Sequence, residues 1–88
     1  MKFITVVTDE KPMVINPLMI ECFYPATARV KQETEVFGGT IKTSSYKEIL
    51  GKLDYGAVMI SLHGWDKPIR VNNCSMDYLT ELIEEATI

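Results

Sequence analysis

The strongest constraint on the fold is an amphipathic pattern at the end of the chain. Residues 75–88, SMDYLTELIEEATI, repeat apolar side chains at the i, i+3, i+4 and i+7 spacing of one helix face. These apolar residues are Leu79, Leu82, Ile83 and Ala86, and the opposite face carries Thr80, Glu81, Glu84 and Glu85. A helix with a single apolar stripe has to cover that stripe with another layer of structure. We therefore expect a C-terminal helix packed on a sheet, with Ser75 as its N-cap and Asp77 near the positive end of its dipole.

The residues before this helix form short runs of β-branched and aromatic residues separated by turn residues, which is typical of strands. The expected strands span residues 3–7, 13–15, 18–24, 28–32, 36–43, 56–62 and 68–71. The strands expected over residues 3–7 and 13–15 flank a polar turn, TDEKP, and predict a hairpin. The strands expected over residues 56–62 and 68–71 flank the turn at residues 63–67 and predict a second hairpin. The run GAVMISL at residues 56–62 is the most apolar and predicts a central strand.

A second, shorter helix is expected in the middle of the chain. Ser45 and Glu48 have the S-x-x-E spacing of a capping box, and this helix would end near residues 51–53. The predicted fold is therefore α+β. It is a single domain over residues 1–88, in which a curved antiparallel sheet carries the C-terminal amphipathic helix on one face and also has this second short helix.

Composition excludes several classes of function. The net charge of −3 on 88 residues argues against binding of duplex nucleic acid through its phosphates, which requires a basic surface. No apolar run approaches the roughly 20 residues of a membrane span, and the apolar N-terminal run is too short for a signal peptide. Cys22 and Cys74 lack the spacing of metal ligands. We expect a cytoplasmic protein with reduced cysteines, no metal, no cofactor and no membrane partner.

Two segments resemble the small flagellar FlbD-type proteins and related short β-rich phage or bacterial proteins. The sequence VINPLMIE at residues 14–21 is similar to their motif LNP-x-x-IE. Residues 60–71, with a Gly in the turn, and the Ser-capped helix that follows are similar to their hairpin-plus-helix outline. The resemblance covers the first quarter and the last third of the chain, and residues 26–55 look like an insertion. It implies a small non-catalytic accessory protein without an active site.

The residues with reactive side chains do not form a catalytic set. His63 is the only histidine, and a general base also requires a nucleophile or an orienting acid; Asp66 is close to it only in sequence. Cys22 lies in an apolar strand pattern and is expected to be buried filler. Cys74 precedes a helix, where the dipole can lower the pKa of a thiol, although an incidental thiol is the favoured interpretation. We expect no catalytic residues and a protein that is not an enzyme.

The largest aromatic side chain lies in the predicted turn HGWDK. Trp65 either covers the edge of the core or anchors a partner, since aromatic residues often dominate the energy of interfaces. The candidate partner-binding residues are Trp65, His63, Tyr24, Tyr46 and Tyr55. They favour a non-enzymatic protein that occupies the surface of a protein partner and is itself a homo-oligomer. Phage-encoded inhibitors of host machinery or immunity are often small acidic chains of this kind.

The alternative function is sequestration of a nucleotide or another small anion, in a pocket between subunits. The candidate ligand residues are Arg29, Lys42, Arg70, Ser44, Ser45 and Trp65. Arg29, Lys31, Lys42 and Arg70 would form a basic patch if they shared one face of the sheet, although a solvated face is the favoured interpretation. The anion would rest at the N-terminus of the helix expected at Ser45, near Lys47. Residues 38–40, GGT, are a weaker candidate for a phosphate loop.

Overall fold

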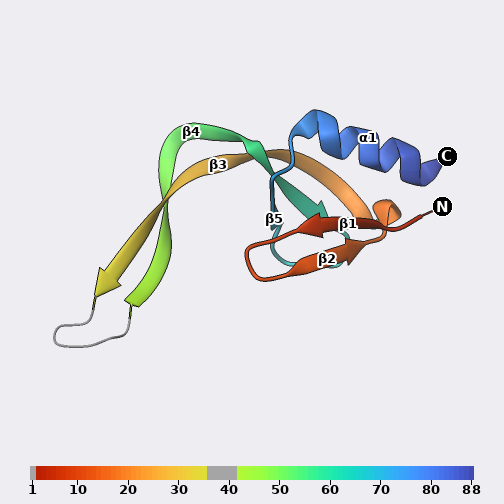
Figure 1. The fold of residues 1–88 in the computed structure, drawn as a ribbon. Coiled ribbons are helices and arrows are strands. Elements are labelled where there is room, and N and C mark those ends of the chain that lie inside the picture. Colours follow the sequence, from red (N-terminus) through yellow and green to blue (C-terminus); the bar gives the residue numbers. More distant parts are fainter. Residues whose placement is uncertain (1, 36–41) are drawn as a thin grey trace.

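The computed structural model describes residues 2–35 and 42–88, which form one antiparallel sheet and one α-helix. The elements are β1 (Ile4–Val7), β2 (Pro12–Ile15), the 3-10 helix η1 (Pro17–Met19), β3 (Ile20–Glu35), β4 (Lys42–Leu62), β5 (Ile69–Asn72) and α1 (Met76–Thr87) (Figure 1). The order of strands across the sheet is β2-β1-β5-β4-β3, and α1 packs against one side of it. The predicted α+β architecture, with an antiparallel sheet and a C-terminal helix, is confirmed.

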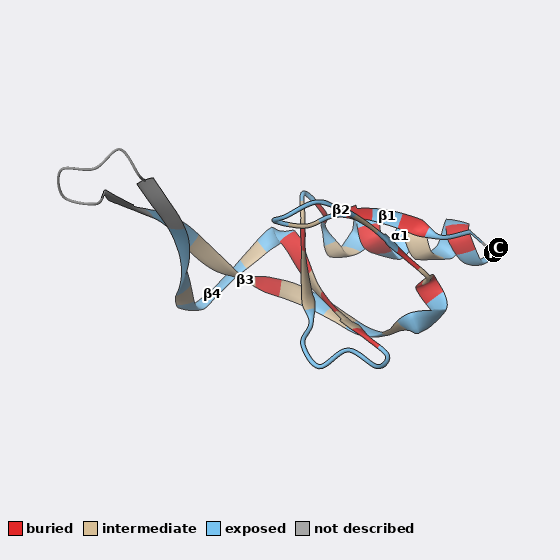
Figure 2. Ribbon diagram, turned by 90° about the horizontal axis from the view of Figure 1, so that it is seen from below, coloured by how far each residue is buried: buried red, intermediate tan, exposed pale blue. Residues whose placement is uncertain are grey.

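The hydrophobic core forms where α1 meets the sheet. Leu79 is completely buried and Ala86 is 4% exposed, while Leu82 and Ile83 pack against the edge of the same core. The sheet contributes most of the remaining buried side chains, which are Ile4, Val6, Ile15, Val58, Ile60, Leu62 and Val71. Figure 2 shows buried positions on α1 and on the strands that it covers. The apolar stripe of the helix is therefore covered by the sheet, as its spacing predicts.

Several other predictions from local sequence signals are also confirmed. The Ser75 hydroxyl accepts a hydrogen bond from the backbone N–H of Tyr78 at 3.1 Å, which is the N-cap arrangement, and Asp77 lies in the first turn of α1. The β1–β2 and β4–β5 hairpins are both present. The apolar run at residues 56–62 lies between β3 and β5, and its Val58 and Ile60 have no exposed surface.

The second helix expected near residues 45–53 is wrong, because these residues belong to β4. Ser45 lies opposite Gln32 and Glu48 lies opposite Arg29 in an antiparallel ladder. β3 also runs from Ile20 to Glu35 as one strand, where two separate strands were expected over residues 18–24 and 28–32. A capping box satisfies only two backbone groups, whereas the ladder satisfies backbone groups along both strands, so long-range pairing overrides the local motif.

The only other helical element in residues 2–35 and 42–88 is η1, which was not expected. It begins after Asn16, whose side chain accepts a hydrogen bond from the Leu18 N–H at 3.0 Å, and Pro17 occupies its first position. Proline suits the first turn of a helix because its missing N–H would have no partner there. Most of the strand expected over residues 36–43 lies outside the described residues.

Beyond the core, β3 and β4 continue as a two-stranded ribbon, which we call the arm. It comprises residues 27–35 of β3 and 42–54 of β4, and it leaves the rest of the molecule, the body, at one end (Figure 1). The register of the β3–β4 ladder shifts twice at the base of the arm. One shift comes just before the pair of Ala26 with Asp54, and the other just before the pair of Arg29 with Glu48. Extra residues in one strand bend a ribbon and increase its twist. The radius of gyration is 15.6 Å, against about 12 Å for a compact chain of this length.

Candidate functional site

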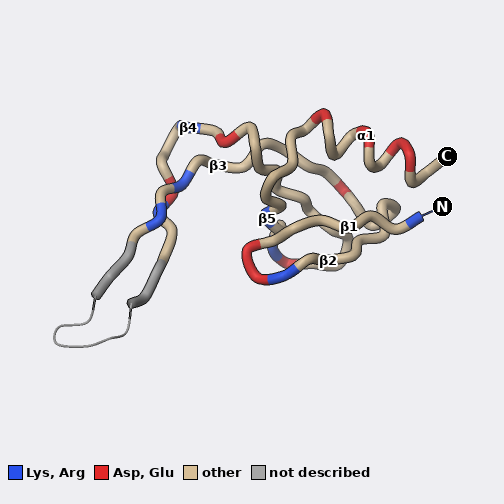
Figure 3. Tube along the Cα trace, viewed as in Figure 1, with Lys and Arg blue, Asp and Glu red and all other residues tan. Residues whose placement is uncertain are grey.

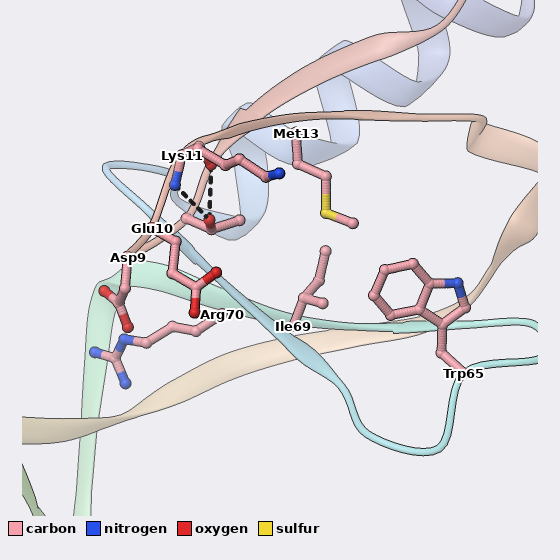
Figure 4. A pocket seen from close by; sticks show the side chains of 8 residues that line it. Asp9, Glu10, Lys11, Met13, Trp65, Ile69 and Arg70 are labelled. Atoms are coloured by element: carbon pink, nitrogen blue, oxygen red, sulfur yellow. Dashed lines mark hydrogen bonds between the residues drawn. The ribbon is translucent and has the colours of Figure 1, made fainter.

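A groove of about 480 Å³ lies between the β1–β2 turn and the β4–β5 hairpin. It exists because β1 and β5 are neighbours in the sheet but pair only at Val7 and Asn72. The lining residues are Thr8, Asp9, Glu10, Lys11, Met13, Trp65, Ile69 and Arg70 (Figure 4). Residues 69–71 of β5 pair with β4 on one side and have no strand partner on the groove side in the described part of the chain.

One end of the groove is apolar. The indole of Trp65 points toward the side chains of Met13 and Ile69, both of which also pack against the core (Figure 4). Trp65 is nevertheless 51% exposed. Its backbone N–H donates to the Leu62 carbonyl at 3.1 Å, and Gly64 in the same turn has a φ of 83°, which favours glycine. Trp65 therefore borders the core and keeps half of its surface available.

The other end of the groove carries charged residues from the β1–β2 turn and from β5. The Thr8 hydroxyl donates to the Lys11 carbonyl at 2.7 Å, which tightens the turn that carries Asp9 and Glu10. Arg70 donates to the Thr27 carbonyl at 2.8 Å and to the Asp54 carboxylate at 3.1 Å, and its side chain is 12% exposed. Its guanidinium is thus held against the base of the arm.

Asp9 connects this end of the groove to the arm through a group of side chains that we call the latch, which consists of Asp9, Arg29, Tyr46 and Asn72. Arg29 donates two hydrogen bonds to the Asp9 carboxylate, from Nη1 at 2.8 Å and from Nη2 at 2.5 Å, and Asn72 donates a third at 2.8 Å. The Arg29 guanidinium lies 3.8 Å from the centre of the Tyr46 ring. The hydrogen bonds from Arg29, then that from Asn72, lower the pKa of Asp9 from 3.8 to about 2.

The candidate ligand residues are only partly brought together. Arg70 and Trp65 line the same groove, and Arg29 reaches its rim through Asp9. Both guanidinium groups already pair with carboxylates, so they do not form an open basic face. Because Ser45 lies in a strand, the anion site expected at a helix N-terminus there is wrong.

The remaining ligand candidates lie on the arm or beyond the described residues. Ser44 and Lys42 are on β4, opposite Glu33 and Glu35 of β3. Residues 38–40, the weaker phosphate-loop candidate, lie outside the described residues.

The candidate partner-binding residues lie on several elements, and only Trp65 lines the groove. His63 is in the same turn, and its Nδ1 is 3.0 Å from a carboxylate oxygen of Glu21 on β3, a partner that the sequence did not indicate. Tyr24 is 44% exposed on β3, while Tyr55 is 71% exposed near the base of the arm.

The two cysteines lie in different environments, and Cys22 differs from the buried position that was expected for it. Cys22 is exposed, because it lies opposite Ser61 on the sheet face away from the core, whereas its neighbour Phe23 lies opposite Ile60 on the core side. Cys74 is buried, and burial raises the pKa of its thiol, which is the opposite of the lowering that a helix dipole could produce and gives no support to the disfavoured alternative of an activated thiol. The described residues contain no group of three or more His, Cys, Asp or Glu side chains arranged to hold a metal ion.

Most of the groove escaped the sequence analysis, although each lining residue lies in a segment whose conformation was predicted. The turn TDEKP gave no sign that it faces the β4–β5 hairpin, because that contact depends on the order of the strands. Met13 and Ile69 were identified only as strand residues. The sequence pointed to two of the lining residues, Trp65 as a large aromatic residue in a turn and Arg70 as a candidate ligand residue.

Comparison of the chain with models of known families, with curated proteins and with solved structures gave no match. The resemblance to FlbD-type proteins stays a prediction. None of the helices among residues 2–35 and 42–88 combines the length and the apolar character needed to cross a membrane.

Proposed function

We propose that the protein acts by non-enzymatic binding, and that an extended segment of a protein partner lies in the groove beside Trp65. The observation that carries this proposal is the side of β5 without a strand partner at residues 69–71, where Ile69 and Arg70 line the groove. An extended peptide can add to such an edge as an extra strand, with main-chain hydrogen bonds for affinity and side-chain pockets for specificity.

The shape of the groove supports the same mode of binding. An apolar side chain of the partner would enter the end formed by Trp65, Met13 and Ile69, where a half-exposed indole is available as an anchor. Glu10 and Lys11 at the other end are exposed and would form the polar rim of the interface. The narrower expectation of a phage-encoded inhibitor stays a prediction.

The test begins with a display library of random peptides selected on the purified protein. Trp65 is the only tryptophan, so its fluorescence reports on the groove when a selected peptide is titrated. We expect extended peptides with an apolar residue to change this fluorescence. We expect Trp65→Ala to weaken their binding, measured by calorimetry, by about 2 kcal/mol or more.

Tyr55→Ala is the matched control, because Tyr55 is also an exposed aromatic residue but lies outside the groove. Its affinity should equal that of the unmodified protein. Equal affinities for all three proteins would remove the groove from the proposal, since selected peptides would then bind elsewhere.

Sequestration of a small anion is the second candidate. Lys11, Arg70 and Trp65 line one groove, and its volume is within the usual range of about 300–1,000 Å³ for small-molecule sites. A ligand that binds the folded protein raises its melting temperature. Melting the protein with a panel of nucleotides and cyclic dinucleotides therefore tests this candidate, and an unchanged melting temperature with every member rejects it.

A further inference from the structure

The outer edge of the arm is a long strand edge that the described part of the chain leaves unpaired. β3 is the last strand of the sheet, and from residue 27 onward it pairs only with β4. In the same stretch, residues 42–54 of β4 pair only with β3. A ribbon of two strands is marginally stable in water, and a third strand or a packed face is needed for independent stability. The arm would therefore gain stability from another strand along its edge.

The sequence of this edge is complementary to itself. Alternate positions 29, 31, 33 and 35 of β3 are Arg, Lys, Glu and Glu. In an antiparallel pair of two β3 strands with Gln32 opposite Gln32, position 29 of one copy lies opposite 35 of the other, and 31 lies opposite 33. All four of these cross-strand pairs join a cation to an anion. A second copy of the chain presents this order by symmetry, whereas an unrelated strand would have to match it by chance.

The same charges disfavour neighbouring registers. An antiparallel pair centred on Lys31 would place the two lysines opposite each other and keep only two opposite-charge pairs, and one centred on Glu33 would do the same with two carboxylates. Like charges directly opposite each other destabilise a strand pair. We propose that the β3 edge of the arm is a homodimer interface, in which two copies pair antiparallel about Gln32 and join their sheets.

Contacts within the chain are compatible with this pairing. Arg29 uses two of its donors on Asp9, and Lys31 also takes part in an interaction within the chain. An ammonium has three N–H donors, so Lys31 can serve a second carboxylate. The Arg29 side chain is 16% exposed and its guanidinium stays in the latch, so the two pairs between positions 31 and 33 carry most of the selection. Exposed ion pairs add little to affinity, so the charges select the partner and the register. Backbone hydrogen bonds and the covering of apolar residues such as Val30, which is 47% exposed, supply the affinity.

The geometry of the dimer follows from its symmetry. Because the strands run antiparallel about Gln32, the two bodies lie at opposite ends of the joined arms. Each copy then keeps its own groove beside Trp65, so the inference does not depend on the proposed function of the groove.

The test measures self-association by sedimentation equilibrium. The unmodified protein should form a dimer, and Lys31→Glu and Glu33→Lys should each weaken that dimer about tenfold or more, because each variant places like charges opposite each other twice. In an equimolar mixture, position 31 of each variant faces an opposite charge at position 33 of the other. The mixture should therefore form a one-to-one heterodimer with an affinity close to that of the unmodified protein, identified by native mass spectrometry.

Lys47→Glu is the matched control for Lys31→Glu, because it changes the net charge by the same amount but lies on β4, opposite Val30. Its dimer dissociation constant should stay within about twofold of that of the unmodified protein. Circular dichroism should show that all the variants are folded. A monomeric unmodified protein at every concentration would overturn the proposal and leave the charges as protection against strand pairing. A mixture without heterodimer, or a control weakened as strongly as the variants, would also overturn it.

Discussion

The body and the arm are built from the same strands but are stabilised in different ways. In the body, α1 covers the sheet and the interior strand β4 has fully buried residues such as Val58 and Ile60. In the arm, residues such as Leu50 and Tyr46 of the same strand are 93% and 52% exposed, and the ribbon is held by its backbone ladder and by the latch at its base. Figure 3 shows acidic residues along α1 and basic residues at several positions on the arm. Burial therefore stabilises the body, whereas pairing and charge stabilise the arm.

The largest expected effect is the loss of stability on shortening a leucine in the body, compared with the same change in the arm. Leu79→Ala should lower the free energy of unfolding by about 2–5 kcal/mol, because it leaves a cavity in the core around a completely buried side chain. Leu50→Ala is the same substitution in the arm, and it should change this free energy by less than about 0.5 kcal/mol because Leu50 is almost fully exposed. Urea denaturation of both variants measures the difference. A large loss with Leu50→Ala would show that the arm contains a packed surface of its own.

The same contrast explains which parts of the fold the sequence predicted. The helical stripe, the Ser75 cap, the two short hairpins and the central strand depend on local periodicity or on one dominant burial pattern, and these predictions are confirmed. The arm depends on which strand pairs with which. Its β4 half contains Ser45 and Glu48 at a spacing that also fits a helix, so the local pattern gave the wrong element.

Prediction of the candidate site was weaker for a related reason. Trp65 was identified from its type and its turn, but the groove requires the β1–β2 turn to lie across from the β4–β5 hairpin. The partners of Arg29 and Arg70 are 20 and 16 residues away in the chain, at Asp9 and Asp54. Periodicity within an element carries no information about contacts over such separations, so the predicted basic residues gave no sign of their carboxylate partners.

A smaller effect tests the two serines that carry capping motifs. Ser75→Ala should lower the free energy of unfolding by about 1 kcal/mol, because the Tyr78 N–H loses its acceptor at the start of α1. Ser45→Ala makes the same change at an exposed strand position and should have little effect. Thermal or urea unfolding compares the two variants. Equal losses would indicate that Ser45 also caps a helix in solution and would contradict the strand assignment in the arm.

The smallest expected effect concerns the latch, which joins the two regions. The pKa of Asp9 is lowered to about 2 in the folded protein, so its ion pair with Arg29 stabilises the fold above pH 4 and is lost as the pH falls from about 4 to 2. Because the Asp9 side chain is 40% exposed, solvent screening limits this contribution to about 1 kcal/mol or less. Urea unfolding should show that the unmodified protein loses stability between pH 5 and pH 2. The Asp9→Asn variant should lose less over the same range, by about 1 kcal/mol or less, because it has no carboxylate to protonate at this position. Amide hydrogen exchange should show, in the same variant, faster exchange near Arg29 and unchanged exchange in α1, since no residue of α1 belongs to the latch. Faster exchange throughout the body would instead make the ion pair part of the global fold and remove the distinction between the two regions.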